Sequence, residues 1–404
     1  MKILWLSHLV PYPPKGGVLQ RSFNLVREIS KNNDIYLLAF NQKALLPNDQ
    51  DLKNAVSALR EYCSEIKVVQ LPADKSALSW YALVLKSFFT KKPYTVNWNW
   101  CARMKETMTQ VVRDFNPDLI HYDTIGLAEY FQHARAIPQV LNHHNIESAM
   151  MGRRAKKERN VLKKLYFYQE AKKIEKYEKR FCRLFQFNLT VSDEDGLTLK
   201  KIDPEIKTEV IPNGVDTSYF TPGAEKSDDE TLIFAGGMNW YPNRDAMLYF
   251  GEEIWPLIKA RKPSVKMYVI GQSPPQELMK MSKEDPNLII TGYVDDVRAY
   301  FGRASVYVCP IRDGGGTRLK ILDALSSGIP VVANSIAAEG IKVTPGEDII
   351  IQDRPEDFAK AVLYLLEHPD ERRRLSLKGR KLVEGTYSWE IIGKKLTNLY
   401  ESLR

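Results

Sequence analysis

The sequence predicts an α/β fold made of two successive series of strands and helices. In both halves of the 404-residue chain, short apolar segments alternate with helical segments, which is the pattern of a parallel sheet. The length favours two or three domains, and a hydrophobic content of 44% is sufficient for buried cores. A polar segment at residues 216–230, with Pro222 and Gly223, separates the two series. We therefore expect two α/β domains joined by a linker.

The positive charge of the chain is concentrated in one segment. Residues 153–180 contain 12 Lys or Arg residues and 4 Glu residues, and 12 − 4 = +8 equals the formal net charge of the whole chain. The remainder is close to neutral, which argues against a general nucleic-acid-binding protein. A solvated helix face would explain the cluster, and an anionic membrane surface is the alternative.

The cysteines and the first residues indicate a cytoplasmic protein. The four cysteines are scattered and form no CxxC motif, which fits a reduced protein without structural zinc. The opening MKILWLSH reads as a short strand and not as a signal-peptide core. No apolar run approaches the roughly 18 residues that span a bilayer, so we expect at most a location at the inner face of the cell membrane.

The first half supplies one series of elements. Helices are expected at about residues 18–30 and, as one long helix, at residues 147–184. Gly16 and Gly17 lie where the chain enters the first helix, a geometry that favours an anion, although a proline-punctuated turn is an open alternative. Strands are predicted at residues 3–6, 34–40, 65–71, 117–121, 139–143, 188–191 and 209–211.

Residues 79–93, SWYALVLKSFFTKKP, form an apolar segment with a basic end. Trp80, Leu83, Val84 and Phe88 give it a wide apolar surface. The segment is either a core helix or a helix that lies in a membrane interface.

Two further polar motifs follow strands of the first half. NHHNIES places His144 and Glu147 at the carboxyl end of a strand, where α/β sheets place their sites, so we predict a functional role for His144 rather than a structural one. The acidic triplet at residues 193–195 could hold a metal. Because Ser192 and Asp193 stand between a strand and a helix, where such residues are preferred N-caps, we predict a helix cap and no metal site.

The most informative stretch is VYVCPIRDGGGTRLKILDALSSGIPVVAN, residues 306–334. A strand, a glycine loop, a helix from about Thr317 to Gly328 and a second strand at residues 330–333 form a phosphate-binding arrangement. Glycine backbone can approach an anion closely, and the free N–H groups and dipole of the first helical turn favour its charge.

The side chains of this helix fit the same purpose. Thr317 is the predicted N-cap, and Lys320 near N3 would have its ammonium group free to reach a phosphate. Asp323 lies one turn further on the same face, where it could accept hydrogen bonds from a ribose. The spacing is neither that of a P-loop nor that of a dinucleotide fold. The alternative is a tight loop followed by a solvated helix.

Several motifs together resemble the glycosyltransferases of family 4. They are IPNGVD with the following Phe220 and Pro222, GYVDD, GGGTRLKILDALSSGIPVV and the terminal YSWE helix. They cover the second half of the chain, whereas the first half matches more loosely through the Gly16-Gly17 loop and HHNIE. The most similar subgroup is the sugar transferases of bacterial exopolysaccharide and cell-surface glycan assembly.

The resemblance implies a GT-B fold, in which two Rossmann-like domains face a cleft. An acceptor domain would span residues 1–212 and a nucleotide-sugar domain residues 213–387. The last helix, residues 388–404, would cross back to the first domain. The remaining second-half elements fit this fold: strands at residues 231–237, 266–270, 288–290 and 348–351, and helices from about residues 243, 355, 369 and 388.

The resemblance also implies roles for particular residues. Lys320 would hold the diphosphate and Asp323 the ribose, while His144 would contact the donor sugar at the reaction centre. Lys320 and His144 are thus the expected catalytic residues. The expected donor-binding set is Gly16, Gly17, Gly236, Gly237, Arg244, Gly314, Gly315, Gly316, Thr317, Arg318, Lys320 and Asp323.

The chain departs from the family pattern at two places. Most members carry two acidic residues eight apart in the glycine-loop stretch, whereas here the second is Asp323 and the first position holds Gly315. The usual Arg and Lys after the first strand of the second domain are missing from GGMNWYPNR. That leaves Arg318 or Arg244 as the second phosphate ligand.

The implied function is transfer of a sugar from a nucleotide sugar to a glycan or lipid-linked glycan, without metal or cofactor and usually with retention at the anomeric carbon. Peripheral contact with an anionic membrane, and no contact with nucleic acid, would fit that function. The alternatives are a nucleotide-sugar epimerase or hydrolase of the same fold, and a non-catalytic nucleotide-sugar-binding scaffold.

Overall fold

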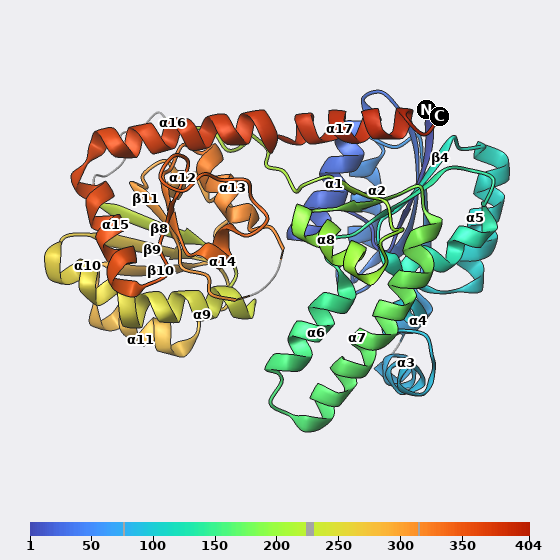
Figure 1. The fold of residues 1–404 in the computed structure, drawn as a ribbon, viewed down its shortest axis with the longest axis horizontal. Helices are drawn as coiled ribbons and strands as arrows, with labels where there is room; N and C mark the ends of the chain where they lie inside the picture. The colour runs from blue at the N-terminus through green and yellow to red at the C-terminus, as the bar shows by residue number, and fades with distance from the viewer. Residues whose placement is uncertain (76, 224–229, 314–315) are drawn as a thin grey trace. The chain divides into compact units, whose positions relative to one another are not determined.

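The computed structural model describes residues 1–75, 77–223, 230–313 and 316–404. The chain divides into two compact units. Unit 1 is Met1–Pro212 with Ile392–Arg404, and unit 2 is Asn213–Ile391. Each unit contains one parallel sheet with helices packed against it (Figure 1). The chain passes from unit 2 to unit 1 within its last helix, α17 (Trp389–Glu401).

The sheet of unit 1 has the order β3-β2-β1-β4-β5-β6-β7, and all its neighbours are parallel. Its central strands are continuous apolar runs, as expected of strands that are covered on both faces. Leu4, Ile120 and Tyr122 belong to the core of this unit. The strands are β1 (Lys2–Ser7), β2 (Asp34–Asn41), β3 (Glu65–Gln70), β4 (Leu119–Tyr122), β5 (Gln139–Asn142), β6 (Phe187–Thr190) and β7 (Thr208–Val210).

The helices of unit 1 include three short 3₁₀ segments. The α-helices outside the terminal segment are α1 (Gly17–Ser30), α2 (Asp49–Leu59), α3 (Ala77–Phe89), α4 (Tyr94–Asn99), α5 (Ala102–Phe115), α6 (Glu147–Lys157), α7 (Val161–Phe181) and α8 (Asp193–Ile202). The 3₁₀ segments are η1 (Pro72–Lys75), η2 (Ile125–His133) and η3 (Cys182–Leu184).

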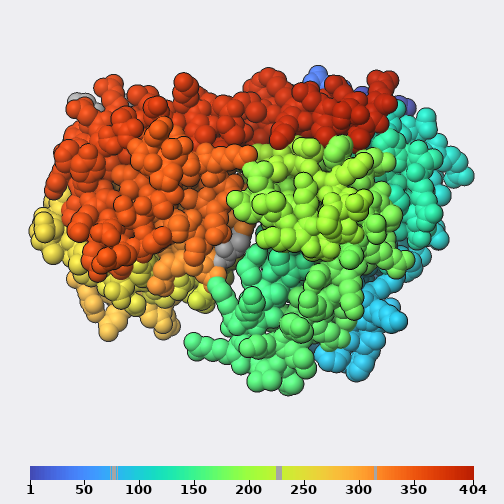
Figure 2. Space-filling model, in the orientation of Figure 1, coloured from blue at the N-terminus to red at the C-terminus, as the bar shows by residue number. Residues whose placement is uncertain are grey.

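The single helix predicted for residues 147–184 is wrong, because the segment is divided into α6 and α7. Asn160 is the N-cap of α7, and its side chain accepts a hydrogen bond from the backbone N–H of Lys163 over 3.1 Å. A capping asparagine ends one helix and starts the next, since its side chain replaces a missing backbone partner. The two helices form a hairpin whose far end protrudes from unit 1 (Figure 2).

The sheet of unit 2 has the order β10-β9-β8-β11-β12-β13, again with parallel neighbours. Phe234, Val306 and Ile321 belong to its core. The strands are β8 (Thr231–Ala235), β9 (Lys266–Ile270), β10 (Leu288–Gly292), β11 (Val306–Cys309), β12 (Val331–Ala333) and β13 (Ile350–Ile351). The helices are α9 (Tyr241–Tyr249), α10 (Trp255–Arg261), α11 (Gln276–Glu284), α12 (Arg298–Phe301), α13 (Leu319–Ser326), α14 (Ser335–Ala338), α15 (Pro355–Glu367) and α16 (Pro369–Thr386), with a π-helical turn η4 (Phe250–Ile254) before α10.

Both sheets reverse their strand order at one point, between β1 and β4 in unit 1 and between β8 and β11 in unit 2. In open α/β sheets, ligands bind outside the carboxyl ends of the strands at such a switch point. The residues that directly follow these four strands are His8, Asp123, Gly236 and Pro310. The topology therefore marks one candidate position in each unit.

The terminal residues 392–404 belong to unit 1 and pack closely on its elements. Nζ of Lys395 donates to the carbonyl oxygen of Val210 over 2.6 Å. The hydroxyl group of Tyr400 lies 2.6 Å from Nδ1 of His121. A Cβ at Gly393 would lie 2.3 Å from Cβ of Glu28, so this close approach requires glycine.

None of the helices in the described residues is both long enough and apolar enough to cross a membrane.

Candidate functional site

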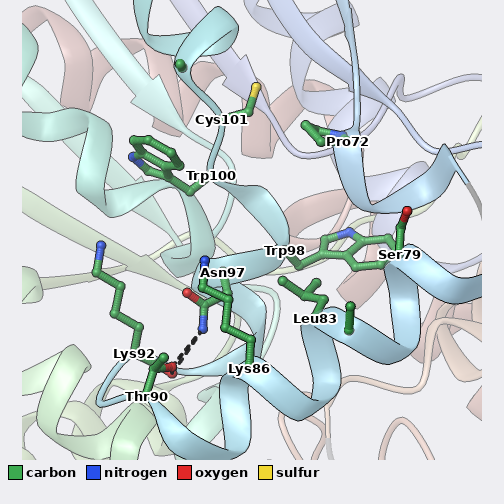
Figure 3. Close-up of a pocket in the computed structure, with 12 residues that line it drawn as sticks. Pro72, Ser79, Leu83, Lys86, Thr90, Lys92, Asn97, Trp98, Trp100 and Cys101 are labelled. Atoms are coloured by element: carbon green, nitrogen blue, oxygen red, sulfur yellow. Dashed lines mark hydrogen bonds between the residues drawn. The ribbon is translucent and has the colours of Figure 1, made fainter.

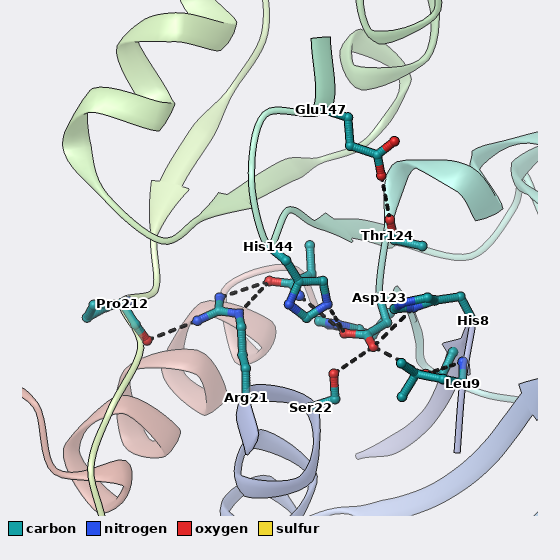
Figure 4. A network of polar contacts seen from close by, with 12 residues as sticks. His8, Leu9, Arg21, Ser22, Asp123, Thr124, His144, Glu147 and Pro212 are labelled. Atoms are coloured by element: carbon teal, nitrogen blue, oxygen red, sulfur yellow. Dashed lines mark hydrogen bonds and ion pairs between the residues drawn. The ribbon is translucent and has the colours of Figure 1, made fainter. Parts of the chain in front are cut away.

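Asp123 is the centre of a buried polar cluster at the switch point of unit 1 (Figure 4). It follows β4 directly and is completely buried. The hydroxyl groups of Ser22 and Ser7 donate to its Oδ2 over 2.7 and 3.2 Å, and Nδ2 of Asn142 donates to Oδ1 over 3.2 Å. These donors are what a buried carboxylate requires, because an unpaired charge in a protein interior is strongly unfavourable.

Three histidine rings surround the same carboxylate. Nε2 of His144 and Nε2 of His121 lie 3.4 and 3.9 Å from Oδ1, and Nδ1 of His8 lies 3.8 Å from Oδ2. Burial lowers the pKa of His8 to about 4 and also lowers the pKa of His121, so both rings are neutral at pH 7. Burial alone would raise the pKa of Asp123, but the His144 and His121 rings beside it hold that pKa well below its usual value.

Arg21 of α1 orients the amide that faces Asp123. Its guanidinium group is buried, and Nε and Nη2 donate to Oδ1 of Asn142 over 3.2 and 2.8 Å. Nη1 donates to the carbonyl oxygen of Pro212 over 3.0 Å. Because two donors occupy the oxygen of Asn142, its NH₂ group must face Asp123. Burial lowers the pKa of Arg21 to about 10, which leaves the guanidinium charged at pH 7.

The structure separates the two histidines of the NHHNIES motif. His144 joins Asp123, whereas His143 is buried and its Nε2 lies 3.1 Å from Oδ1 of Asn188. Oε1 of Glu147 accepts a hydrogen bond over 3.2 Å from the hydroxyl group of Thr124, which is the residue after Asp123. Burial raises the pKa of Glu147.

One group of side chains in the described part of the chain could hold a metal ion. The ligand atoms of His8, Asp123 and His144 all lie within 4.8 Å of one another, and two histidines with a carboxylate are a common donor set for transition metals. The predicted acidic triplet has a different role. Ser192 is the N-cap of α8, and its hydroxyl accepts from the backbone N–H of Asp195 over 3.2 Å, which confirms the predicted cap.

In unit 2, Lys320 lies at the start of α13, beside the carboxyl end of β8. Its Nζ donates to Oδ1 of Asn243 and lies 4.6 Å from the centre of the Phe234 ring. A Cβ at Gly236 would lie 2.6 Å from Nζ, so glycine there makes room for the ammonium group. The ammonium group is thus paired with Asn243, and the expectation that it can reach a phosphate stays a prediction. Since an ammonium has three donors, Asn243 orients it without saturating it.

Burial shifts the pKa of both charged groups of α13. Burial lowers the pKa of Lys320 to about 8 and raises the pKa of Asp323 to about 7. The positive charge of Lys320 partly offsets the rise in the pKa of Asp323. Negative charge beside an ammonium favours its charged form. An anion bound at Lys320 would therefore hold the lysine protonated.

The glycine loop differs from its predicted form. Helix α13 begins at Leu319, its N-cap is Arg318, and no side chain caps it, so Thr317 is not the N-cap. Within the described residues, Oγ1 of Thr317 is buried and has no hydrogen-bond partner. Gly316 has a φ of +81°, which favours glycine. Gly314 and Gly315 lie outside the described residues.

The two candidate arginines have different surroundings. Arg318 is buried, and its Nη1 and Nη2 donate to the carbonyl oxygens of Gly316 and Asp313 over 2.7 and 3.2 Å. Arg318 thereby shapes the loop. Arg244 is exposed on α9, with its guanidinium 5.8 Å from the centre of the Tyr241 ring.

The remaining predicted glycines lie at strand and helix ends. The carbonyl oxygen of Gly237 accepts from Nδ2 of Asn243 over 2.8 Å. Gly16 is the N-cap of α1 with a φ of +95°, and Gly17 is the first residue of that helix. A Cβ at Gly16 would meet no atom within 4 Å, so the space before α1 is open.

Family models match both parts of the chain. The model of Glycosyltransferase Family 4 matches residues 15–219, which is half of the chain, and that of Glycosyl transferases group 1 matches residues 229–368. The chain belongs to glycosyltransferase family 4. The resemblance seen in the sequence motifs is thereby confirmed.

The curated relatives of this family 4 chain are distant. A GDP-mannose-dependent monoacylated alpha-(1-6)-phosphatidylinositol monomannoside mannosyltransferase of Corynebacterium glutamicum is 24% identical over 217 residues, which are 48% of this chain and 56% of that protein. The capsular polysaccharide biosynthesis glycosyltransferase CapM of Staphylococcus aureus is 24% identical over 153 residues, 36% of this chain and 40% of that protein. The chain spans about half the length of the curated relatives it matches.

Solved structures establish the fold of this family 4 chain. Sucrose-phosphate synthase from Thermosynechococcus elongatus is 17% identical with a TM-score of 0.70, covering 100% of this chain and 99% of that one. Anabaena HepE in complex with UDP is 15% identical with a TM-score of 0.66, covering 100% of both chains. The family 4 chain thus has the predicted α/β GT-B fold, with two Rossmann-like units.

Several site residues of this family 4 chain are absent from the sequence-based prediction. Asp123, His8 and His121 lie in or beside predicted strands without a predicted role, and Asn243 opens a predicted helix. A signal is present for two of them, because His8 and Asp123 stand within two residues of the ends of predicted apolar strands, as His144 does. The carboxyl-end rule applied to every strand would find both, but nothing in the sequence pairs Asn243 with Lys320.

Proposed function

We propose that this protein transfers a sugar from a nucleotide sugar, held by unit 2, to a glycan acceptor held by unit 1. The observation that carries the proposal is the surroundings of Lys320. An oriented ammonium group, the first turn of α13 and a glycine at the end of β8 occur together at a topological switch point. Such a combination binds a diphosphate, because it offers charge, N–H donors and close backbone approach.

Sugar transfer from a nucleotide sugar requires that negative charge be stabilised at the diphosphate. When the glycosidic bond to the nucleotide breaks, negative charge builds on the departing β-phosphate. Lys320 and the dipole of α13 are arranged before the reaction, so they can stabilise that charge without reorganising. We therefore propose that transfer proceeds without a metal ion.

In unit 1 we propose that His144 contacts the donor sugar and that Asp123 orients His144. The carboxylate is buried, ionised and held by Ser7, Ser22 and Asn142, so its position is fixed. A fixed carboxylate beside an imidazole selects the ring orientation and the proton position, as in other catalytic pairs. Retention at the anomeric carbon is part of the proposal.

The nature of the donor is suggested by the relatives. The Corynebacterium protein is named as GDP-mannose-dependent, and Anabaena HepE was solved with UDP and with UDP-glucose. The CapM relative is named for capsular polysaccharide biosynthesis. We propose a UDP- or GDP-linked hexose as donor and a growing surface polysaccharide as acceptor.

The proposal is tested by incubating the purified full chain with UDP-glucose or GDP-mannose, with and without a bacterial glycolipid fraction as acceptor. Transfer of labelled sugar to that fraction, with an α-linked product by NMR, is expected. Donor epimerised or hydrolysed at the same rate without acceptor would indicate an epimerase or hydrolase. Nucleotide binding with no turnover of any donor would indicate a scaffold, and either result would overturn the proposal.

We further propose that unit 1 works at an anionic membrane surface, at the cytoplasmic face of the cell membrane. The α6–α7 hairpin exposes Val161, Leu162 and Leu165, with Leu162 78% exposed, and Lys163 and Lys164 lie between them. Apolar side chains interleaved with lysines suit the boundary between head groups and acyl chains. The alternative is that these lysines form a solvated basic face.

Vesicle co-sedimentation decides between a membrane surface and a solvated face. Binding to phosphatidylglycerol vesicles but not to phosphatidylcholine vesicles, weakened by high salt, is expected of the membrane surface. Replacing Leu162 and Leu165 by Ser should reduce that binding, whereas replacing the exposed Leu377 of unit 2 by Ser should not. Equal and negligible pelleting with both lipids would favour a soluble acceptor.

A further inference from the structure

A pocket of about 700 Å³ lies in unit 1 between α3, α4 and the start of α5 (Figure 3). This volume is within the range of small-molecule sites. Leu83 and Lys86 of α3, Asn97 and Trp98 of α4, and Trp100 line it, among others. None of the predicted donor-binding or catalytic residues is part of this lining.

Helix α3 is apolar on two faces. Ser79, Ala82, Leu83 and Lys86 are spaced three and four residues apart, so they share the face that lines the pocket. The exposed large apolar side chains of α3 stand on another face: Tyr81, Leu85, Phe88 and Phe89, with Phe89 78% exposed. An ordinary core helix has one apolar face and one polar face. The helix thus separates an apolar pocket from an apolar outer surface.

For residues 79–93, the structure bears on the core-helix alternative, and the membrane-interface alternative stays a prediction. Leu83 and Val84 are half-buried and Phe88 is exposed, so the segment is not simply a core helix. The side chain of Trp80 lies outside the described residues. The end of α3 is anchored to α7, because Nε2 of Gln169 donates to the carbonyl oxygen of Phe88 over 2.9 Å.

The polar part of the pocket is cationic. Lys86 and Lys92 line it, and the described lining contains no acidic side chain. Lys92 is paired with Glu129 over 2.7 Å outside this lining, which leaves Lys86 as the pocket's main cation. An apolar pocket with two indole rings and a lysine fits an amphiphile that carries an apolar chain and a phosphate.

The pocket is one helix away from the polar cluster of unit 1. Asn97 and Trp98 of α4 line the pocket, while Thr95 of the same helix contacts the carboxylate of Glu147. Glu147 in turn accepts from Thr124, the residue after Asp123. An occupant of the pocket would therefore lie close to the cluster whose His144 is proposed to contact the donor sugar.

We propose that this pocket binds the apolar chain of a lipid-linked acceptor, with Lys86 on its phosphate. The inference rests on the proposed sugar transfer and names the acceptor class: a glycan joined through phosphate to an alkyl or isoprenoid chain. The exposed outer face of α3, which carries Tyr81, Leu85 and Phe89, lies against the bilayer from which that chain is taken.

Binding of decyl phosphate to the full chain, below its micelle concentration, tests the site by calorimetry. Hexyl phosphate should bind more weakly, by about fourfold for each methylene lost, which corresponds to about 0.8 kcal/mol. Inorganic phosphate should show no detectable binding. Equal affinity for hexyl and decyl phosphate would overturn the proposal, because an apolar pocket must discriminate chain length.

Matched substitutions on α3 locate the binding. Leu83→Trp fills the pocket and should weaken decyl phosphate binding at least tenfold, whereas Leu85→Trp on the exposed face should leave it unchanged. Lys86→Gln should weaken it about tenfold, and Lys91→Gln, outside the lining, should have no effect. Ala82→Phe serves as a second filling variant if Leu83→Trp does not fold. Unchanged binding in the folded filling variants would overturn the proposal.

Three further outcomes distinguish a pocket site from a bulk membrane surface and from a failed transferase. Binding to phosphatidylglycerol vesicles that persists in Leu83→Trp, with no binding of monomeric decyl phosphate, would show a membrane surface and overturn the pocket. We expect Leu83→Trp to transfer sugar to a soluble acceptor at the same rate as the unmodified protein. Transfer to a lipid-linked acceptor should be lost in this variant. If decyl phosphate binds but no donor is ever turned over, the proposed transferase function fails and the pocket assignment stands.

Discussion

The hydroxyl group of Tyr400 lies 2.6 Å from Nδ1 of His121, although 279 residues separate them in the chain. Burial raises the pKa of Tyr400 well above its usual value and lowers that of His121, so both groups are neutral. The hydroxyl group can donate to Nδ1 or accept from it, and we infer that it donates, with the proton of His121 on Nε2, because Nε2 faces an ionised carboxylate. That nitrogen faces Oδ1 of Asp123 at 3.9 Å. The C-terminal segment thus orients a ring of the polar cluster.

Tyr400→Phe should reduce turnover several-fold while leaving the affinity of unit 2 for a nucleoside diphosphate unchanged. Without the phenol, Nδ1 of His121 is buried and unpaired, at a cost to the free energy of unfolding of about 1–3 kcal/mol. NMR of labelled imidazole nitrogens should show that the ring no longer has a single tautomer. The exposed Tyr168→Phe is the control. A single unchanged tautomer in Tyr400→Phe would contradict the positioning role.

Asp123→Asn should abolish most transfer activity, by a factor of about 10²–10⁴, without weakening nucleotide binding. The substituted amide can no longer carry charge, and its NH₂ group would face the donors of Ser22 or Asn142. Loss of these charge-assisted hydrogen bonds should lower the free energy of unfolding by about 1.5–3 kcal/mol. Denaturant unfolding and steady-state kinetics measure the two effects. Transfer at the unmodified rate in a folded variant would remove Asp123 from the mechanism.

Lys320→Ala should weaken the binding of UDP or GDP tenfold or more, since a charge-assisted contact is worth roughly 1.5–3 kcal/mol. Lys266 provides a matched control, because it is exposed at the amino end of β9, away from the carboxyl edge of the sheet. Calorimetry on both variants is the measurement. The same affinity in Lys320→Ala as in Lys266→Ala would refute the assignment of the diphosphate site.

The affinity for a nucleoside diphosphate should fall as the pH rises above about 8. The pKa of Lys320 is lowered to about 8 in the free protein, so below that pH the ammonium is charged and above it the lysine is neutral. Each further pH unit should then cost up to tenfold in affinity. Titrations from about pH 7 to about pH 10 measure the trend. Lys320→Ala should flatten it, and an equally steep decline in that variant would assign the titration to another group.

Treatment with EDTA should leave sugar transfer intact. The proposed charge stabilisation comes from Lys320 and the start of α13, and the acidic residues 193–195 form the first turn of α8 behind the cap of Ser192. Activity is measured after dialysis against the chelator, with magnesium and with manganese added back. Complete loss that manganese restores would reject the metal-free mechanism and implicate His8, Asp123 and His144 as ligands.

Local patterns in the sequence were sufficient for the architecture. Apolar runs bounded by turns predicted the parallel strands, because a strand covered on both faces must be apolar throughout. Two motifs in the sequence marked candidate sites: the loop before Lys320 and the polar residues around His144. The structure places both Lys320 and His144 near the carboxyl ends of strands. Boundaries were less certain. The break before Asn160 was missed, even though asparagine is a preferred N-cap, because residues 156–160, KKERN, contain no proline or glycine that would mark it.

What the sequence could not determine is which distant residues meet. Parallel strands are joined by crossover helices, so the residues at neighbouring strand ends are far apart in the chain. Asp123 therefore contacts side chains from other segments of the chain: Ser7, Ser22, Asn142 and His144. Asn243 accepts a hydrogen bond from Lys320, which is 77 residues away in the chain. Tyr400 contacts His121. The sequence alone determined the two α/β series, the family and Lys320 as the candidate ligand of a phosphate. The tertiary structure decided which partners bury and orient those residues, because their protonation depends on burial and on neighbours that only folding brings together.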